Sequence, residues 1–504
     1  MLKRLTLNSL LLSLFILSSC ANFGTRKPSS NDSMEFSVLV DQVRWATSLH
    51  LEDSATCKEN YDQLYTKLFS LAGDSNFINL NDINVIDEEI KESFKARISL
   101  KESFKSFKNN NECLQSASDV FKALRYIEDY LIEVRMNLTQ MASSEFVNLK
   151  GEFPYLLVNP KYEQDFKSYE DLKSGDVILS RGNAFSSAAI ARIGNNDYQF
   201  SHLSFVYQGK KDDTLMTTEA HIEIGSVVEP LIEHINSKNA REAVFRYEDP
   251  DVAHLASKFI YDRVLENQTK KKNVEYDFSM NFRDDSRLFC SEIISSGFKK
   301  ALPNEDFFPM FKTKFSVGLI PFLNTIGVPV NRDNIKDVEV FAPGDIQFDP
   351  RFELIAEWRN PKKMEESRLK DFILTKMFER MDKENYKIDA SLKMEATSKS
   401  IWLLRRLPVV KRFLQKKIPI NMNAGQIELF MAIDKVGDSI YRELEKISLR
   451  YDRPMTPIEI YTALDQIFSR DYETYKKYKK GNVSDIYGEV IVAEKPIFHQ
   501  LFHP

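Results

Sequence analysis

The spacing of apolar residues changes twice along this chain, and these changes constrain the fold more than any other feature. In residues 34–136 apolar residues recur three and four positions apart, which predicts amphipathic helices. In residues 169–358 short alternating runs predict strands with helices between them, and from residue 360 onward the helical spacing returns. We expect strands at Asp176–Ser180, Leu203–Tyr207, Leu215–Ile224 and Ala243–Tyr247. The fold class predicted is therefore α+β.

Length and composition divide the chain and exclude two classes of protein. A chain of 504 residues exceeds what one hydrophobic core usually serves. We predict a helical bundle over residues 34–150, a mixed domain over 165–358 and a helical domain over 359–504. The clearest C-terminal helix carries one apolar face, formed by Ile433, Val436, Ile440, Leu444 and Ile447. With 43% hydrophobic residues, 28% charged residues and a net charge of -5, the chain is neither a disordered protein nor a basic nucleic-acid binder.

The N-terminus has the features of an export signal. Lys3 and Arg4 precede an apolar run over residues 10–17 that is too short to span a bilayer, so residues 1–19 are predicted to be a signal peptide. Nothing after residue 20 is apolar for long enough to cross a membrane.

The end of that run resembles the bacterial lipobox. It reads Leu17-Ser18-Ser19-Cys20, and the resemblance implies that Cys20 carries a diacylglycerol anchor with fatty acyl chains such as palmitate. Ala21 stands where a signal for retention in the inner membrane would place Asp. We therefore expect a lipoprotein of the outer membrane that faces the periplasm or the cell surface, with residues 20–33 as a flexible tether. The alternative is an ordinary secretory signal whose cysteine is incidental.

The chain has four cysteines, and each is assigned a role. Cys20 takes the lipid. Cys57 and Cys113 both lie in the predicted helical bundle, and in an oxidising periplasm we expect them to form a disulfide. Cys290 is left unpaired, which in an exported protein means either an inert buried thiol or a reactive one.

Three polar residues of the mixed domain form a candidate catalytic set. His202 begins a predicted strand, and Glu219 lies in a strand expected to pair with it, where it could orient the imidazole. Cys290 precedes a predicted helix. Unpaired N–H groups at a helix N-terminus and a nearby imidazolium stabilise a thiolate, and the same N–H groups can stabilise an oxyanion. The five histidines at positions 50, 234, 254, 499 and 503 belong to no such set.

The order of these residues resembles the permuted papain-like hydrolases of the YiiX type, related to NlpC-type amidases and lecithin:retinol acyltransferases. Ordinary papain-like enzymes place the cysteine before the histidine, whereas here the histidine comes first, as a circular permutation requires. The matching motifs are Gly175-Asp176, Ser201-His202, Glu219-Ala220, Tyr276-Asp277 and Cys290-Ser291-Glu292. Phe289 departs from the Tyr or Trp that many relatives carry before the cysteine. The resemblance covers residues 172–302 and implies an antiparallel sheet packed on helices.

The resemblance also implies roles for the matching residues. Cys290 would be the nucleophile, His202 its base and Glu219 the residue that orients His202. Residues expected to bind substrate or to support the site structurally are Gly175, Asp176, Tyr276 and Ser291. We expect acyl transfer to water or another acceptor without a metal or cofactor. The substrate would be a peptide or cell-wall amide or a lipid acyl ester, and a thioester also suits this chemistry. The sequence indicates no particular protein partner.

Three alternatives remain open. Glu219, His221 and Glu223 alternate onto one strand face, so with His202 they could form a metal site. The domain could instead be an inactive lipid-binding or scaffolding module. Residues 401–417 combine bulky apolar residues with six positive charges, which suits either an anionic lipid surface or two ordinary helices broken at Pro408.

Overall fold

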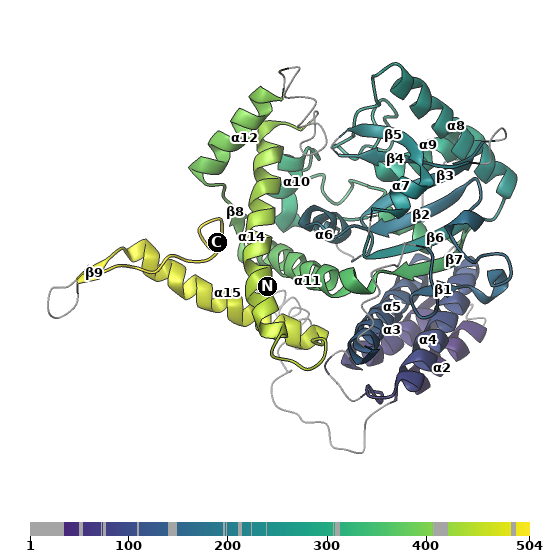
Figure 1. Cartoon of the computed structure of the whole chain (residues 1–504), viewed down its shortest axis with the longest axis horizontal. Coiled ribbons are helices and arrows are strands. Elements are labelled where there is room, and N and C mark those ends of the chain that lie inside the picture. The colour runs from purple at the N-terminus through teal and green to yellow at the C-terminus, as the bar shows by residue number, and fades with distance from the viewer. Residues whose placement is uncertain are drawn as a thin grey trace, which may run out of the picture.

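The computed structural model of the chain consists of an N-terminal helical part, a central sheet and a C-terminal helical part (Figure 1). It describes residues 35–49, 54–71, 73, 77–107, 110–139, 149–194, 197, 199–209, 214–222, 224–237, 239–305, 307, 313–405, 407, 422–484 and 490–504. The expected signal peptide, Cys20, the tether, Glu223 and most of residues 401–417 lie outside these ranges. None of the helices within them is long and apolar enough to span a bilayer.

The N-terminal part is helical, as the apolar spacing predicts. Its helices are α2 (Phe36–Ser48), α3 (Ser54–Leu71), α4 (Ile83–Ser103) and α5 (Asn111–Thr139), with a 3-10 turn, η1, at Phe104–Phe107. Asp82 caps α4, because its side chain accepts a hydrogen bond from the backbone N–H of Asn84. The predicted disulfide between Cys57 and Cys113 is confirmed and joins α3 to α5.

The central sheet has seven antiparallel strands in the order β1-β7-β6-β2-β3-β4-β5. They are β1 (Leu156–Val158), β2 (Asp176–Arg181), β3 (His202–Gln208), β4 (Leu215–His221), β5 (Gly225–Pro230), β6 (Arg241–Tyr247) and β7 (Phe352–Arg359). The predicted α+β class is confirmed. The strand expected over Leu215–Ile224 is shorter than predicted, because the chain turns after His221 and Gly225, with a φ of 78°, starts the next strand.

Both faces of the sheet are buried. Along β2, Val177 and Leu179 join the main apolar core, whereas Ile178 points to a second cluster on the other face. Helices α8 (Pro250–Thr269) and α9 (Cys290–Ala301) pack together and contact β3 and β4. The remaining helices of this part are α6 (Phe185–Arg192), α7 (Leu231–Ile235) and α10 (Ile320–Ile326), with 3-10 turns η2 (Pro160–Tyr162), η3 (Tyr169–Asp171), η4 (Val317–Leu319) and η5 (Pro343–Phe348).

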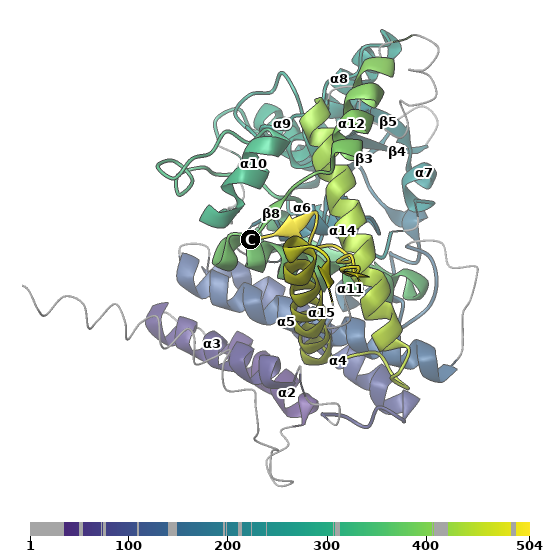
Figure 2. The same cartoon turned by 90° about the vertical axis from the view of Figure 1, so that its left-hand side faces the viewer.

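The C-terminal part packs against the sheet domain through α6. It contains α11 (Pro361–Glu384), α12 (Leu392–Leu404), α14 (Ala424–Ser448) and α15 (Pro457–Lys480), with short strands β8 (Lys387–Ile388), β9 (Val483–Ser484), β10 (Val490–Ile491) and β11 (Phe502–His503). Figure 2 shows α14 running along the molecule beside α12. The predicted apolar face of α14 is buried, except that Ile447 is only partly covered. A Cβ on Gly437 would lie 2.6 Å from the ring of Phe185, so glycine permits α14 to contact α6 closely.

A buried ion network joins the N-terminal helices to the sheet. The carboxylate of Glu357 on β7 is bound by three arginines, with an N–O distance of 2.7 Å to Arg97 and 2.6 Å each to Arg125 and Arg359. All four side chains are fully buried. Burial opposes the charge on Glu357, but the arginines outweigh this effect and hold the pKa of the carboxyl well below its usual range.

Candidate active site

Glu219 is at the centre of the candidate site. It lies on β4, and His202 is the first residue of the paired strand β3. Its Oε2 atom is 2.9 Å from Nε2 of His202 and 3.4 Å from Nε2 of His221, and its Oε1 atom is 2.9 Å from Nδ1 of His234. The structure therefore brings His202 and Glu219 together as the sequence predicts and surrounds the carboxylate with three imidazoles.

The histidines around Glu219 differ in exposure. The side chains of His202 and His221 are 22% and 31% exposed, whereas that of His234 is 3% exposed. The rings of His202 and His221 stack with centroids 5.4 Å apart. Solvent can therefore reach His202 and His221, but His234 contacts Glu219 from the interior.

The charges of Glu219 and His234 stabilise each other. Burial opposes the ionised carboxylate, but His234 and His202 outweigh it and hold the pKa of Glu219 well below its usual range. Burial likewise opposes the charged form of His234, but the charge of Glu219 outweighs it and raises the pKa of His234 to about 9. The carboxylate is thus ionised at neutral pH, which is what a residue that orients a catalytic imidazole requires.

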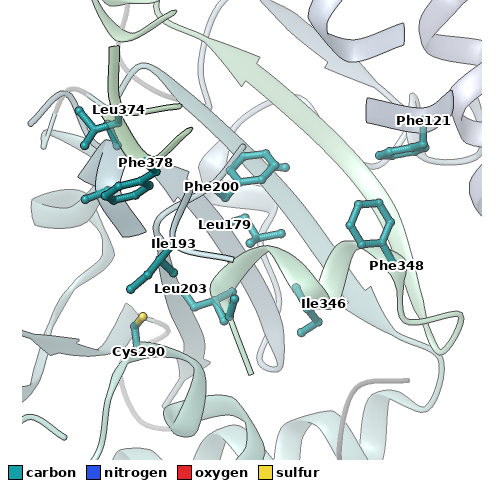
Figure 3. Packing of buried hydrophobic residues seen from close by; sticks show 14 of the residues in the cluster. Phe121, Leu179, Ile193, Phe200, Leu203, Cys290, Ile346, Phe348, Leu374 and Phe378 are labelled. Atoms are coloured by element: carbon teal, nitrogen blue, oxygen red, sulfur yellow. The ribbon is translucent and has the colours of Figure 1, made fainter. Parts of the chain in front are cut away.

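Cys290 is the first residue of α9, the helix that packs against β3 and β4. Figure 3 shows its side chain at the border of the apolar cluster that includes Leu203. The residue is 2% exposed, and it is the free cysteine within the described part of the chain. Burial raises the pKa of the thiol to about 12, against hydrogen bonds from the backbone of Leu203 and from Ser291. This direction is opposite to the one expected from the helix N-terminus, because desolvation outweighs the N–H groups.

One cavity contains all three predicted catalytic residues. Its volume is about 230 Å³, and Cys290, His202 and Glu219 all line it. Much of the rest of its lining is polar, contributed by serines, acids and histidines of α6, β5 and α7, with Tyr276 beside them. A thiol, an imidazole and a carboxylate in one cavity are the groups that thiol-dependent acyl transfer uses.

The predicted supporting residues divide into two groups. Tyr276 lines the cavity, and Ser291 follows Cys290 directly on α9 and is among the groups that act to lower the pKa of the thiol. Gly175 and Asp176 lie outside the lining of this cavity. Gly175 has a φ of 91° and no room for a Cβ beside Ala253, and Asp176 pairs with Arg246 at 2.7 Å. Gly175 therefore permits the turn before β2, and Asp176 stabilises the start of that strand.

The sequence does not predict the roles of two further residues near the site, His234 and Glu292. The sequence assigns His234 to no candidate site. In the structure it contacts Glu219, because the short helix α7 that follows β5 positions it there. Its local sequence contains no signal for this contact. Glu292 of the Cys-Ser-Glu motif accepts a 2.8 Å hydrogen bond from the backbone N–H of Phe289 and caps α9. A Glu three residues after the helix cap is a recognisable capping signal.

Three residues of the metal-binding alternative lie close together in the structure. One ligand atom from each of His202, Glu219 and His221 lies within 4.8 Å of the other two. Two imidazoles and a carboxylate are a donor set that suits zinc. Glu223, the fourth residue of that alternative, lies outside the described residues.

Comparison with known proteins confirms the resemblance seen in the sequence. Residues 171–355 match a family described as permuted papain-like amidase enzymes of the YaeF/YiiX type, the C92 family. The match lies within the central domain and agrees with the papain-like α+β core predicted from the sequence. A search of the solved structures finds the metalloprotein YiiX from Escherichia coli O157:H7, with 17% identity and a TM-score of 0.27. The match covers 37% of this chain and 98% of that one. A search of curated proteins finds no match.

Proposed function

We propose that the permuted papain-like domain is a thiol hydrolase or acyltransferase that cleaves an amide or ester acyl bond through Cys290, His202 and Glu219. The observation that carries the proposal is the cavity, which contains all three side chains. The match to an amidase family supports hydrolysis of an amide bond in particular.

The reaction follows from the positions of these groups. The Sγ atom of Cys290 attacks the carbonyl carbon, and the thiol proton passes to His202. His202 then gives this proton to the leaving amine or alcohol, and a thioester to Cys290 forms. Water or another acceptor attacks the thioester and regenerates the thiol. Glu219 accepts a hydrogen bond from Nε2 of His202 throughout, which leaves the other ring nitrogen for proton transfer.

The raised pKa of the thiol adds a requirement to this mechanism. A thiol with a pKa of about 12 is neutral at physiological pH, so attack on a carbonyl or on an alkylating agent needs proton transfer to His202 in the same step. The N–H groups at the start of α9, where Cys290 is the first residue, can then stabilise the oxyanion.

The cellular setting belongs to the same proposal and is supported by the N-terminal sequence. A lipobox-like Cys20 would anchor the chain through its lipid to the outer membrane. Substrates within reach are peptide or cell-wall amides and lipid acyl groups. Of these we favour the amide, because the match is to an amidase family and much of the cavity lining is polar.

The proposal is tested by the rate of alkylation of Cys290 as a function of pH, using the chain without residues 1–20. We expect His202→Ala to slow alkylation of the folded protein near neutral pH by at least tenfold. The matched control is His254→Ala. His254 lies on α8, packs against Tyr207 of β3 and is not part of the cavity lining. Equal rates in wild type and His202→Ala would refute the nucleophile-base pair. A reactive thiol would justify a screen of peptide amides and lipid esters.

A second candidate is an inactive lipid-binding or scaffolding module. The observation in its favour is the burial of Cys290, which is 2% exposed and has a raised pKa. Such a module needs no reactive cysteine. A thiol that stays unreactive in the folded wild type as well as in His202→Ala would support the module over the enzyme.

A further inference from the structure

We propose that His202, Glu219 and His221 form a zinc site, and that zinc bound there blocks the thiol chemistry of Cys290. The inhibition rests on the proposed function, whereas the binding of zinc does not. The site is therefore a regulatory one, in which the same side chains either serve catalysis or hold the cation.

The distances between the ligand atoms suit a tetrahedral zinc ion. With zinc–ligand bonds of about 2.0–2.1 Å, two ligand atoms lie roughly 3.3 Å apart. Oε2 of Glu219 is 2.9 Å from Nε2 of His202 and 3.4 Å from Nε2 of His221. The two imidazole nitrogens lie within 4.8 Å of each other. Small rotations of the side chains of His202 and His221 would complete the geometry.

The carboxylate of Glu219 is held in place, and two further acids line the cavity. His234 holds the second carboxylate oxygen at 2.9 Å and so fixes the orientation of the ligand from behind, as supporting groups do in zinc proteins. The acids Glu229 and Glu233 line the same cavity. The exposed faces of His202 and His221 give the ion a path from solvent, while Glu219 is buried beneath them.

Zinc binding and thiol activation exclude each other at His202. An imidazole bound to zinc through Nε2 carries its proton on the other nitrogen, which then cannot accept the proton of Cys290. When zinc binds Nε2, the single proton of neutral His202 moves from Nε2 to the other ring nitrogen by exchange with solvent, so no net proton is released. No redox change is involved, and removal of the metal restores the base.

The site itself is tested by titrating zinc into the chain without residues 1–20. Calorimetry measures the affinity, and metal analysis measures the number of zinc ions bound per chain. We expect one zinc per chain in wild type and in the control His254→Ala. His221→Ala should lower the affinity by at least tenfold, because one of three protein ligands is lost. His221 is partly exposed, so this variant should fold, and a thermal melt checks this. Wild-type affinity in His221→Ala, or no binding in wild type, would overturn the proposal.

The inhibition is tested by the ratio of Cys290 alkylation rates with and without saturating zinc, measured within each variant. The zinc concentration is the lowest that saturates wild type. In wild type we expect a fall of at least tenfold that a chelator reverses, and in His221→Ala at that concentration a smaller fall, in proportion to its weaker binding. An equal fall in both proteins would show that zinc binds the thiol directly and would overturn the proposed site. If the zinc-free wild-type thiol is unreactive, the proposed function and the inhibition both fail, and the titration alone decides whether zinc binds.

Discussion

Two of the buried glutamates on the sheet are each surrounded by three basic side chains. Glu357 on β7 is bound by arginines, and Glu219 on β4 by histidines. Arginine keeps its proton at any physiological pH, so the first cluster has a permanent charge and belongs to the packing. Histidine exchanges its proton near neutral pH, and two of the three are partly exposed. The comparison shows that the type of base and its access to solvent decide whether a buried carboxylate has partners that can exchange protons.

The largest effect is expected at the arginine cluster. Glu357→Gln removes the carboxylate that three buried guanidinium groups share. Arg97 and Arg359 keep their ion pairs with Glu128, but Arg125 is left without an ion pair among the described residues, and we expect a loss of about 3–5 kcal/mol in the free energy of unfolding. The measurement is denaturant unfolding followed by circular dichroism. The matched control is Glu384→Gln, in an ion pair with Arg380 in which the glutamate is 45% exposed, where we expect a loss below about 1 kcal/mol. Equal losses in both variants would contradict the structural role of the cluster.

A smaller effect, on reactivity, is expected at the histidine cluster. Glu219→Gln removes the charge that orients His202 while keeping the shape of the side chain. We expect alkylation of Cys290 to slow by roughly 100-fold, at the lower end of what acid-base catalysis contributes. Glu233→Gln provides the control, because Glu233 lines the same cavity but has no contact with His202 among the described residues. Unchanged reactivity in Glu219→Gln would mean that the carboxylate does not position the base.

The smallest effect concerns the pH dependence of stability. The pKa of His234 rises from 6.5 to about 9 on folding, so its contribution is complete below pH 6.5 and is lost as the pH rises through about 9. We therefore expect the stability difference between wild type and His234→Gln to be largest at and below pH 6.5, to shrink between pH 6.5 and about 9, and to stay constant above that. For one proton, the stability difference cannot change by more than about 1.4 kcal/mol per pH unit. Urea unfolding at several pH values measures it, and a difference that does not vary with pH would contradict the prediction.

Much of the fold could be predicted because hydrophobic periodicity is a local property. Val177, Ile178 and Leu179 alternate between the two faces of the sheet as a strand requires, and Ile433 and Val436 lie on the buried face of α14. The predicted end of one strand was wrong, because a backbone turn ends that strand and apolar spacing does not reveal the turn. The strand expected to continue to Ile224 stops at His221, because Gly225 begins a new strand with a positive φ.

The candidate site was predicted in part, and the missing part is non-local. His202, Glu219 and Cys290 follow from motif order, and the cavity contains all three. His234 is separated from Glu219 by a strand and a turn into α7, and no pattern in the sequence indicates their contact. The pKa of the thiol could not be predicted either, because it depends on how deeply α9 is packed.

The sequence by itself determined which chemical groups the chain contains, the order of its motifs and the helices and strands that carry them. These properties depend on residues a few positions apart. The tertiary structure alone decided that Glu357 is surrounded by arginines and Glu219 by histidines, and that Cys290 is buried. Such properties depend on packing between distant segments, because burial and charge pairing set the free energy of each ionised form.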